Sequence, residues 1–150
     1  MGLGDEGLGR GGKKDGRMES VEIAVVSGSH LVTELTDELE QFCRGHGDGL
    51  VSVFAPHATA GLALMETGSG SESDLARLID EVLPTSGPYQ HRHGSVGHGR
   101  DHILPCLVSP SLTIPVRDGR PLLGTWQRLV LVDTNRDNPR RRVRFSFLPG

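Results

Sequence analysis

Apolar residues recur at every second position in several short segments of this chain, which is the pattern of β-strands with one buried face. These segments are residues 21–25, 112–116 and 143–147. Residues 129–132 are apolar at every position, and this run predicts a central strand with both faces buried. Two further short runs, residues 50–54 and 62–65, are mostly apolar and also predict strands.

Two other segments follow the helical period. The first is predicted from apolar residues spaced i, i+4 and i+7, namely Leu35, Leu39 and Phe42. The second is predicted from an apolar stripe that consists of Leu75, Leu78, Ile79 and Val82. Ser71 and Asp74 resemble a capping box at the start of this second helix, and Pro84 ends it.

The turn signals between these segments complete the predicted fold. Asp118 and Gly119 are typical of a tight hairpin turn, and the nearby Pro115 and Pro121 place the hairpin at a sheet edge. About seven strands with two or three helices, and no internal repeat, predict an α+β domain with a largely antiparallel sheet. We expect a single domain over residues 18–150, preceded by a flexible tail, residues 1–17, that is rich in glycine and charge.

Composition argues against several classes of protein. The chain has 150 residues and a net charge of −3, which gives no general reason to expect nucleic-acid binding. It has no run of the ~20 apolar residues that a membrane helix needs, and its N-terminus lacks the apolar core of a secretory signal. Cys43 and Cys106 lack C-x-x-C spacing, so we expect free thiols in a reducing compartment and a cytoplasmic protein.

One local concentration of positive charge departs from this balance. Residues 140–147 read RRRVRFSF, and from Arg142 onward polar and apolar residues alternate. This alternation favours the solvated outer face of a strand. A phosphate-binding patch is the alternative.

Histidines are concentrated in one short stretch, residues 91–102, which read HRHGSVGHGRDH. Neutral imidazole is the commonest protein metal ligand, and a catalytic zinc-like site takes three protein ligands and leaves one position open. If the chain is helical between His98 and His102, both side chains project from one face. The intervening glycines let such a loop fold tightly around an ion. We interpret the stretch as a metal or proton-transfer site, and a loop that is merely rich in histidine is the alternative.

Other candidate groups stand near the ends of predicted strands. Glu66 and Asp133 are placed to orient a histidine or hold a metal-bound water, as is Asp101 within the histidine stretch. A solvated or capping carboxylate is the alternative for each. Trp126, beside Gln127, is either a core residue or part of the wall of a ligand pocket. The chain has neither a G-x-S-x-G elbow nor a nucleotide-binding glycine fingerprint, which argues against a serine hydrolase and a nucleotide-hydrolysing motor.

The order of these motifs resembles the YjbQ family, which is also described as secondary thiamine-phosphate synthase-like. Residues 56–61 read PHATAG and are followed by Glu66, a helix, the histidine-rich loop ending at His102, and GTWQ at residues 124–127. The resemblance extends over residues 20–148 and rests on two motifs in a fixed order.

The resemblance implies an α+β fold in which sheets pack as a sandwich, and a homotrimer. It also implies a divalent metal near the histidines, with His57, His93 and His102 as the ligands that match by motif. This loop is one residue longer than the family pattern, so His91 is an alternative to His93 as the third ligand. The residues expected to contact substrate are Thr59, Trp126 and Gln127.

The activity implied by the resemblance is a weak condensation of a hydroxymethylpyrimidine diphosphate with a thiazole phosphate, which releases pyrophosphate. A diphosphate leaving group is usually stabilised by Mg²⁺ and cations, whereas a histidine cluster suits zinc-like or nickel-like ions better. Two functions stay open. One is a metal-dependent enzyme on a small phosphorylated or heterocyclic substrate, in which Glu66, His98 or Asp133 moves a proton. The other is a non-catalytic trimer that binds a metal or a metabolite.

Overall fold

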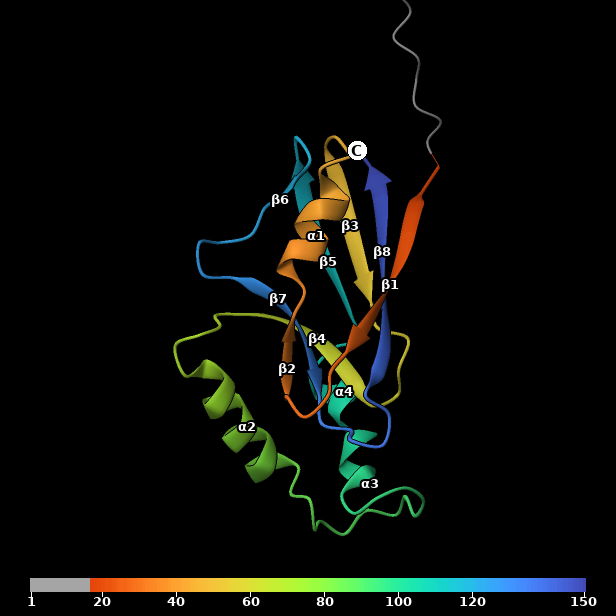
Figure 1. Ribbon diagram of the computed structural model, residues 1–150, viewed down its shortest axis with the longest axis vertical. Helices are drawn as coiled ribbons and strands as arrows, with labels where there is room; N and C mark the ends of the chain where they lie inside the picture. The colour runs from red at the N-terminus through yellow and green to blue at the C-terminus, as the bar shows by residue number, and fades with distance from the viewer. Residues whose placement is uncertain (1–16) are drawn as a thin grey trace, which may run out of the picture.

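Eight strands form two antiparallel sheets in the computed structural model, which describes residues 17–150 (Figure 1). The larger sheet has the order β1-β8-β3-β5-β6, with bounds β1 Glu19–Val26, β8 Arg140–Pro149, β3 Gly49–Phe54, β5 Ser111–Arg117 and β6 Arg120–Pro121. The smaller sheet has the order β2-β7-β4, with bounds β2 Val32–Glu34, β7 Arg128–Asp133 and β4 Ala60–Met65. The predicted α+β class with largely antiparallel sheets is confirmed.

The central strand β7 is buried on both faces and separates two hydrophobic clusters. The first cluster lies between the two sheets and includes Leu129, Leu131, Val51, Val143 and Phe145. The second lies between the smaller sheet and the helix α2 (Ser71–Val82) and includes Val130, Val132, Ile79 and Leu83. The smaller sheet is therefore the middle layer of this part of the molecule (Figure 1). Its middle strand β7 is the central strand that the uninterrupted apolar run predicted.

Both predicted helices are present, and α1 spans Thr36–Cys43 with Leu39 fully buried. The start of α2 differs from the prediction. Gly70, at a φ of 95°, precedes the first residue of α2, and no side chain caps the helix. The predicted capping box of Ser71 and Asp74 is therefore wrong, because Ser71 already lies inside the helix.

Two short helices, α3 (His98–Asp101) and α4 (Leu104–Leu107), lie at the end of the molecule beyond the smaller sheet (Figure 1). The β5–β6 hairpin lies at the edge of the larger sheet, as predicted, and Asp118 and Gly119 both have positive φ, at 49° and 71°. Strand β2 was not predicted, because three residues are too few to show an alternation. The tail predicted for residues 1–17 lies outside the described residues except for Arg17.

Within residues 17–150, no helix is both long enough and apolar enough to cross a bilayer. Cys43 is buried and Cys106 is exposed, and both are free thiols. Burial raises the pKa of the Cys43 thiol to about 11, so this residue acts as a small core hydrophobe rather than a nucleophile.

Candidate functional site

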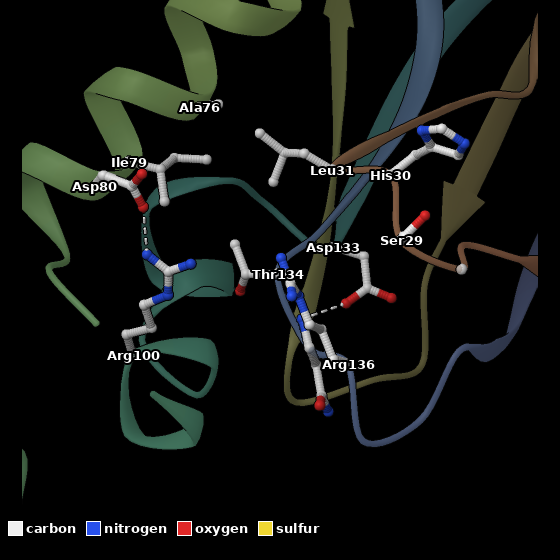
Figure 2. Close-up of a pocket in the computed structure, with 12 residues that line it drawn as sticks. Ser29, His30, Leu31, Ala76, Ile79, Asp80, Arg100, Asp133, Thr134 and Arg136 are labelled. Atoms are coloured by element: carbon white, nitrogen blue, oxygen red, sulfur yellow. Dashed lines mark hydrogen bonds and ion pairs between the residues drawn. The ribbon is translucent and has the colours of Figure 1, made fainter. Parts of the chain in front are cut away.

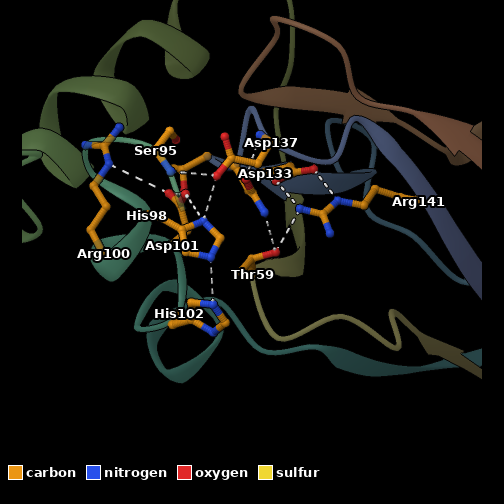
Figure 3. Close-up of polar contacts among 11 residues, drawn as sticks. Thr59, Ser95, His98, Arg100, Asp101, His102, Asp133, Asp137 and Arg141 are labelled. Carbon is orange, nitrogen blue, oxygen red and sulfur yellow. Dashed lines mark hydrogen bonds and ion pairs between the residues drawn. The ribbon is translucent and has the colours of Figure 1, made fainter. Parts of the chain in front are cut away.

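Three histidines converge at the end of the molecule that contains α3, and Figure 3 shows two of them, His98 and His102. His91, His98 and His102 each place one ring nitrogen within 4.8 Å of the other two. Nε2 of His98 lies 3.0 Å from Nε2 of His102, and the ring centroids of His91 and His102 are 4.2 Å apart. We refer to these three residues as the histidine cluster. Three convergent imidazoles match the ligand number of a catalytic zinc-like site with one open position.

The local backbone explains why these side chains meet. Helix α3 begins after Gly97, and the turn from His98 to His102 places the two side chains on one face. The preceding loop packs directly against the same ring: at Gly94, whose φ is 89°, a Cβ would lie 2.5 Å from Cγ of His98. Glycine at this position therefore allows the loop to hold His91 against His98.

The other side of the His98 ring faces two carboxylates (Figure 3). Nδ1 of His98 lies 3.2 Å from Oδ2 of Asp137 and 3.7 Å from Oδ2 of Asp101. Asp137 also accepts a hydrogen bond of 3.0 Å from the backbone N–H of Ser95, which lowers the pKa of its carboxyl. Because a carboxylate beside Nδ1 favours a proton there, the lone pair of His98 Nε2 is directed into the cluster.

Two buried nitrogens of the histidine cluster have no hydrogen-bond partner among the residues that the structure describes. Nε2 of His91 is buried and has no hydrogen-bond partner. Nδ1 of His98 is also buried, and despite its closeness to Asp137 it makes no hydrogen bond. Burial, and then the neighbouring imidazoles, lower the pKa values of His91 and His102. Both rings are therefore neutral near pH 7, which is the state that a metal ligand requires.

Two of the three predicted metal ligands are not in the histidine cluster. The ring of His93 lies beside that of His91, with centroids 4.0 Å apart, but the nitrogen that joins the set belongs to His91. Nε2 of His57 accepts a hydrogen bond of 2.9 Å from the backbone N–H of Arg142. Burial, and then the charge of Arg141, lower the pKa of His57. His57 is thus a neutral ring whose Nε2 is already engaged by the backbone of Arg142, and the structure favours His91 as the third ligand.

Asp133 lies in a buried ion pair rather than in an open site (Figure 3). Nε of Arg141 donates to Oδ2 of Asp133 at 2.6 Å, and Nη2 donates to Oδ1 at 2.9 Å. Ser27 and the backbone N–H of Asn135 donate to the same carboxylate at 2.8 and 2.9 Å. The hydroxyl oxygen of Thr59 accepts from Nη2 of Arg141 at 2.8 Å. We call these five residues the Arg141–Asp133 network. Because they are buried and hydrogen-bonded to one another, Asp133 and Thr59 support the fold.

The remaining predicted residues lie at the opposite end of the smaller sheet. Strand β4 starts beside Asp133 and runs antiparallel to β7. Glu66 follows the last residue of β4, about 20 Å from the Asp133 end at ~3.3 Å per residue. Trp126 and Gln127 precede β7 at the Glu66 end, and Trp126 is 70 % exposed, so it is not a core residue. One chain therefore does not bring these three residues to the histidine cluster.

The family model described as UPF0047 protein YjbQ-like matches residues 21–150. The chain belongs to this family. A UPF0047 protein of Mycobacterium tuberculosis H37Rv is 53 % identical over 133 residues, which are 89 % of this chain and 100 % of that relative. A UPF0047 protein of Archaeoglobus fulgidus is 32 % identical over 111 residues, which are 74 % of this chain and 85 % of that relative. The resemblance seen in the motifs is confirmed.

Solved structures have the same fold. A YbjQ-like protein of unknown function from Sulfolobus solfataricus has a TM-score of 0.82 at 23 % identity, covering 89 % of this chain and 99 % of that one. A conserved hypothetical protein from Thermus thermophilus has a TM-score of 0.72 at 30 % identity, covering 85 % of this chain and 98 % of that one. The two-sheet arrangement of this UPF0047 chain is therefore the arrangement of solved relatives.

Two residues that organise the site were missed in the sequence. Asp137 lies in the loop between β7 and β8, where no period marks it as different from any solvated aspartate. Arg141 did carry a signal. It has the same strand parity as Val143 and Phe145, which are fully buried, so the alternation already placed it on the inner face.

Proposed function

We propose that this UPF0047 protein is a divalent-metal-dependent enzyme acting on a small molecule, with His91, His98 and His102 as the metal ligands. The observation that supports the proposal is the convergence of three imidazoles whose ring nitrogens lie within 4.8 Å of one another, with a buried, unpartnered Nε2 on His91. An imidazole set of this kind suits zinc-like or nickel-like ions better than Mg²⁺. When bound, such an ion supplies a Lewis acid and lowers the pKa of a bound water.

The protein's own groups divide the remaining work. Asp137 orients His98 through Nδ1, and Gly94 lets the loop approach the ring. Burial raises the pKa of Asp101, whose Oδ1 accepts a hydrogen bond of 2.6 Å from the Thr134 hydroxyl. A carboxyl with a raised pKa beside the ligands is suited to hold and release a proton. We therefore assign to Asp101 the role that the sequence offered to Glu66, His98 or Asp133.

The reaction to assay first is the condensation of a hydroxymethylpyrimidine diphosphate with a thiazole phosphate, because the motif resemblance supports it. The homotrimer and the cytoplasmic location are part of the same proposal. Glu66 and Trp126 lie far from the histidine cluster of their own chain, so a site that uses all of these residues has to be assembled from more than one chain. Size-exclusion chromatography with light scattering measures the assembly: a trimeric mass supports it, and a monomeric mass contradicts it.

The test of the metal site is elemental analysis of the untagged protein after zinc or nickel loading and dialysis. We expect about one ion per chain, and loss of this ion from His91→Ala, His98→Ala and His102→Ala. His57→Gln is the matched control, because the structure engages His57 elsewhere, and it should retain the ion. Stoichiometric metal in His102→Ala, or loss from His57→Gln, would contradict the assignment.

A non-catalytic metal- or metabolite-binding trimer is the second candidate. It is favoured by the small size of the cavity at the cluster, about 170 Å³, which is below the ~300 Å³ at which typical small-molecule sites begin. The deciding measurement is turnover with the metal site full. Consumption of many substrate molecules per chain supports the enzyme, and stoichiometric binding without product supports the binding protein.

A further inference from the structure

Adjoining cavities run from the histidine cluster to the space beside α2. The first, of about 170 Å³, is lined by His91 and His98. The second, of about 240 Å³, shares the loop around Ser95 with the first. The third, of about 170 Å³, shares Arg100 and Arg136 with the second (Figure 2). Adjoining cavities therefore connect the histidine cluster with Arg100 and Arg136, and a small molecule bound at the cluster can extend toward them.

The carboxylates that line the second and third cavities are already engaged. Asp80 accepts a hydrogen bond of 2.6 Å from Nη1 of Arg100 (Figure 2). Asp133 belongs to the Arg141–Asp133 network and faces its own arginine. Asp101 accepts a hydrogen bond from the Thr134 hydroxyl, and burial raises its pKa. None of these carboxylates neutralises a further cation in the cavities.

Hydrogen-bond donors in the third cavity are, in contrast, exposed and not engaged by other residues of the described part of the chain. Among residues 17–150, the guanidinium of Arg136 makes neither an ion pair nor a hydrogen bond, although it lines both the second and the third cavity. The side chains of Ser29 and His30 line the same cavity and likewise have no hydrogen-bond partner in the described part of the chain (Figure 2). A guanidinium offers five N–H donors in a planar fork that matches a carboxylate or a phosphate. The local excess of donors is therefore complementary to an oxyanion.

We propose that Arg136, together with Ser29 and His30, binds the oxyanion group of the small molecule that reacts at the histidine cluster. The substrate class is thus a small molecule with a carboxylate or a phosphate at one end and its reacting group at the other. That a reaction takes place at the cluster rests on the proposed function, whereas the oxyanion site does not need a metal. The remaining cavity between Arg136 and the cluster, lined by Thr134 and Asp101, holds the body of the molecule.

The test is a two-dimensional NMR titration of the full-length protein with inorganic phosphate, and separately with acetate, after the metal has been removed by a chelator. Saturable shifts of the amide signals of residues 28–31 and 134–136 are expected for at least one anion. Arg136→Gln should raise the Kd for the anion about tenfold or more, because charge-assisted hydrogen bonds are lost. Arg117→Gln, an exposed arginine on β5, is the charge-matched control and should leave the Kd unchanged.

The two anions distinguish the source of the oxyanion. Tighter binding of phosphate identifies a phosphate ester, and tighter binding of acetate identifies a carboxylate. The proposal is overturned if neither anion gives saturable shifts at these residues, or if Arg117→Gln weakens the Kd as much as Arg136→Gln. The proposed metal site is tested by a different variant, because metal retained in His102→Ala would contradict it without affecting the oxyanion site. Metal analysis of Arg136→Gln should show full occupancy. Loss of metal from Arg136→Gln would count against a distinct oxyanion site.

Discussion

Two polar groupings of this UPF0047 protein lie close together, and they differ in how completely their atoms are satisfied. In the Arg141–Asp133 network, each carboxylate oxygen of Asp133 accepts two hydrogen bonds. In the histidine cluster, Nε2 of His91 and Nδ1 of His98 are buried without a partner. The first grouping is complete within residues 17–150, and the second lacks a partner that these residues do not provide.

The difference separates residues that hold the fold from residues that bind. A buried polar atom without a partner costs about 1–3 kcal/mol, so the buried Nε2 of His91 destabilises the fold unless a ligand satisfies it. A buried ion pair with all its hydrogen bonds made has no such need, and removal of one partner leaves an uncompensated charge. Chemical type alone does not show this difference, because Asp133 and the histidines are equally plausible catalytic groups in the sequence.

The largest effect is expected from a substitution in the Arg141–Asp133 network, in which every hydrogen bond of the Asp133 carboxylate is made. Asp133→Ala should lower the free energy of unfolding by about 3–5 kcal/mol, because Arg141 would remain buried without its counter-charge. Arg141 is only 3 % exposed, so water cannot readily replace the carboxylate. Urea denaturation of the metal-free protein measures the change.

The matched variant on the other side is His98→Ala, measured in the same metal-free state. It removes a buried Nδ1 that makes no hydrogen bond, so its stability loss should be much smaller than that of Asp133→Ala. Equal losses in the two variants would show that the histidine cluster is as structural as the ion pair. A loss of less than about 1 kcal/mol in Asp133→Ala, the size of an ordinary surface change, would show that the network is not what holds this end of the sheet.

A smaller effect is expected where the two groupings meet, at Asp137. Asp137→Asn keeps the size of the side chain and an acceptor for the Ser95 N–H, but removes the negative charge beside His98 Nδ1. We expect metal affinity to fall about 10- to 100-fold, with little change in stability. Competition with a chromophoric chelator measures the affinity, and Asp37→Asn on α1 controls for the loss of one surface charge. Unchanged affinity would mean that Asp137 does not orient His98.

The same contrast explains how much of the molecule was predictable. Strand β7 was recognised because four consecutive apolar residues can be buried only between two layers, and the Asp118–Gly119 turn because few sequences favour two positive φ values in succession. These features depend on neighbours along the chain. The fold class followed from them, and the resemblance of the motifs supplied the family.

The site was predicted as a set of residue types rather than as an arrangement. The histidine stretch was recognised, but the choice between His91 and His93 depends on how the loop turns at Gly94, which no period encodes. His57 was grouped with the stretch through the motif resemblance, whereas the structure pairs it with the backbone of Arg142. Contacts of this kind join residues that are far apart in the sequence, and a single sequence carries no signal for them.

The smallest expected effect concerns His57. Its Nε2 has a hydrogen-bond partner, as Asp133 does, but the ring can gain a proton. Its folded-state pKa is lowered, chiefly by burial and then by Arg141. The unfolded chain therefore binds a proton at higher pH than the folded chain does. The stability that His57 contributes is present above its unfolded pKa of ~6.5, and it is lost as pH falls through that value toward the folded pKa.

His57→Gln keeps an acceptor for the Arg142 N–H and cannot titrate. Between about pH 7.5 and about pH 5.5, where an unperturbed histidine changes its charge, the metal-free variant should lose less stability than the parent protein. Some pH dependence should persist, because the pKa values of His91 and His102 are also lowered and act in the same direction. Urea denaturation at the two pH values gives the comparison. An equal loss in both proteins would mean that His57 titrates alike in the folded and unfolded chains, and that burial and the charge of Arg141 do not hold it neutral.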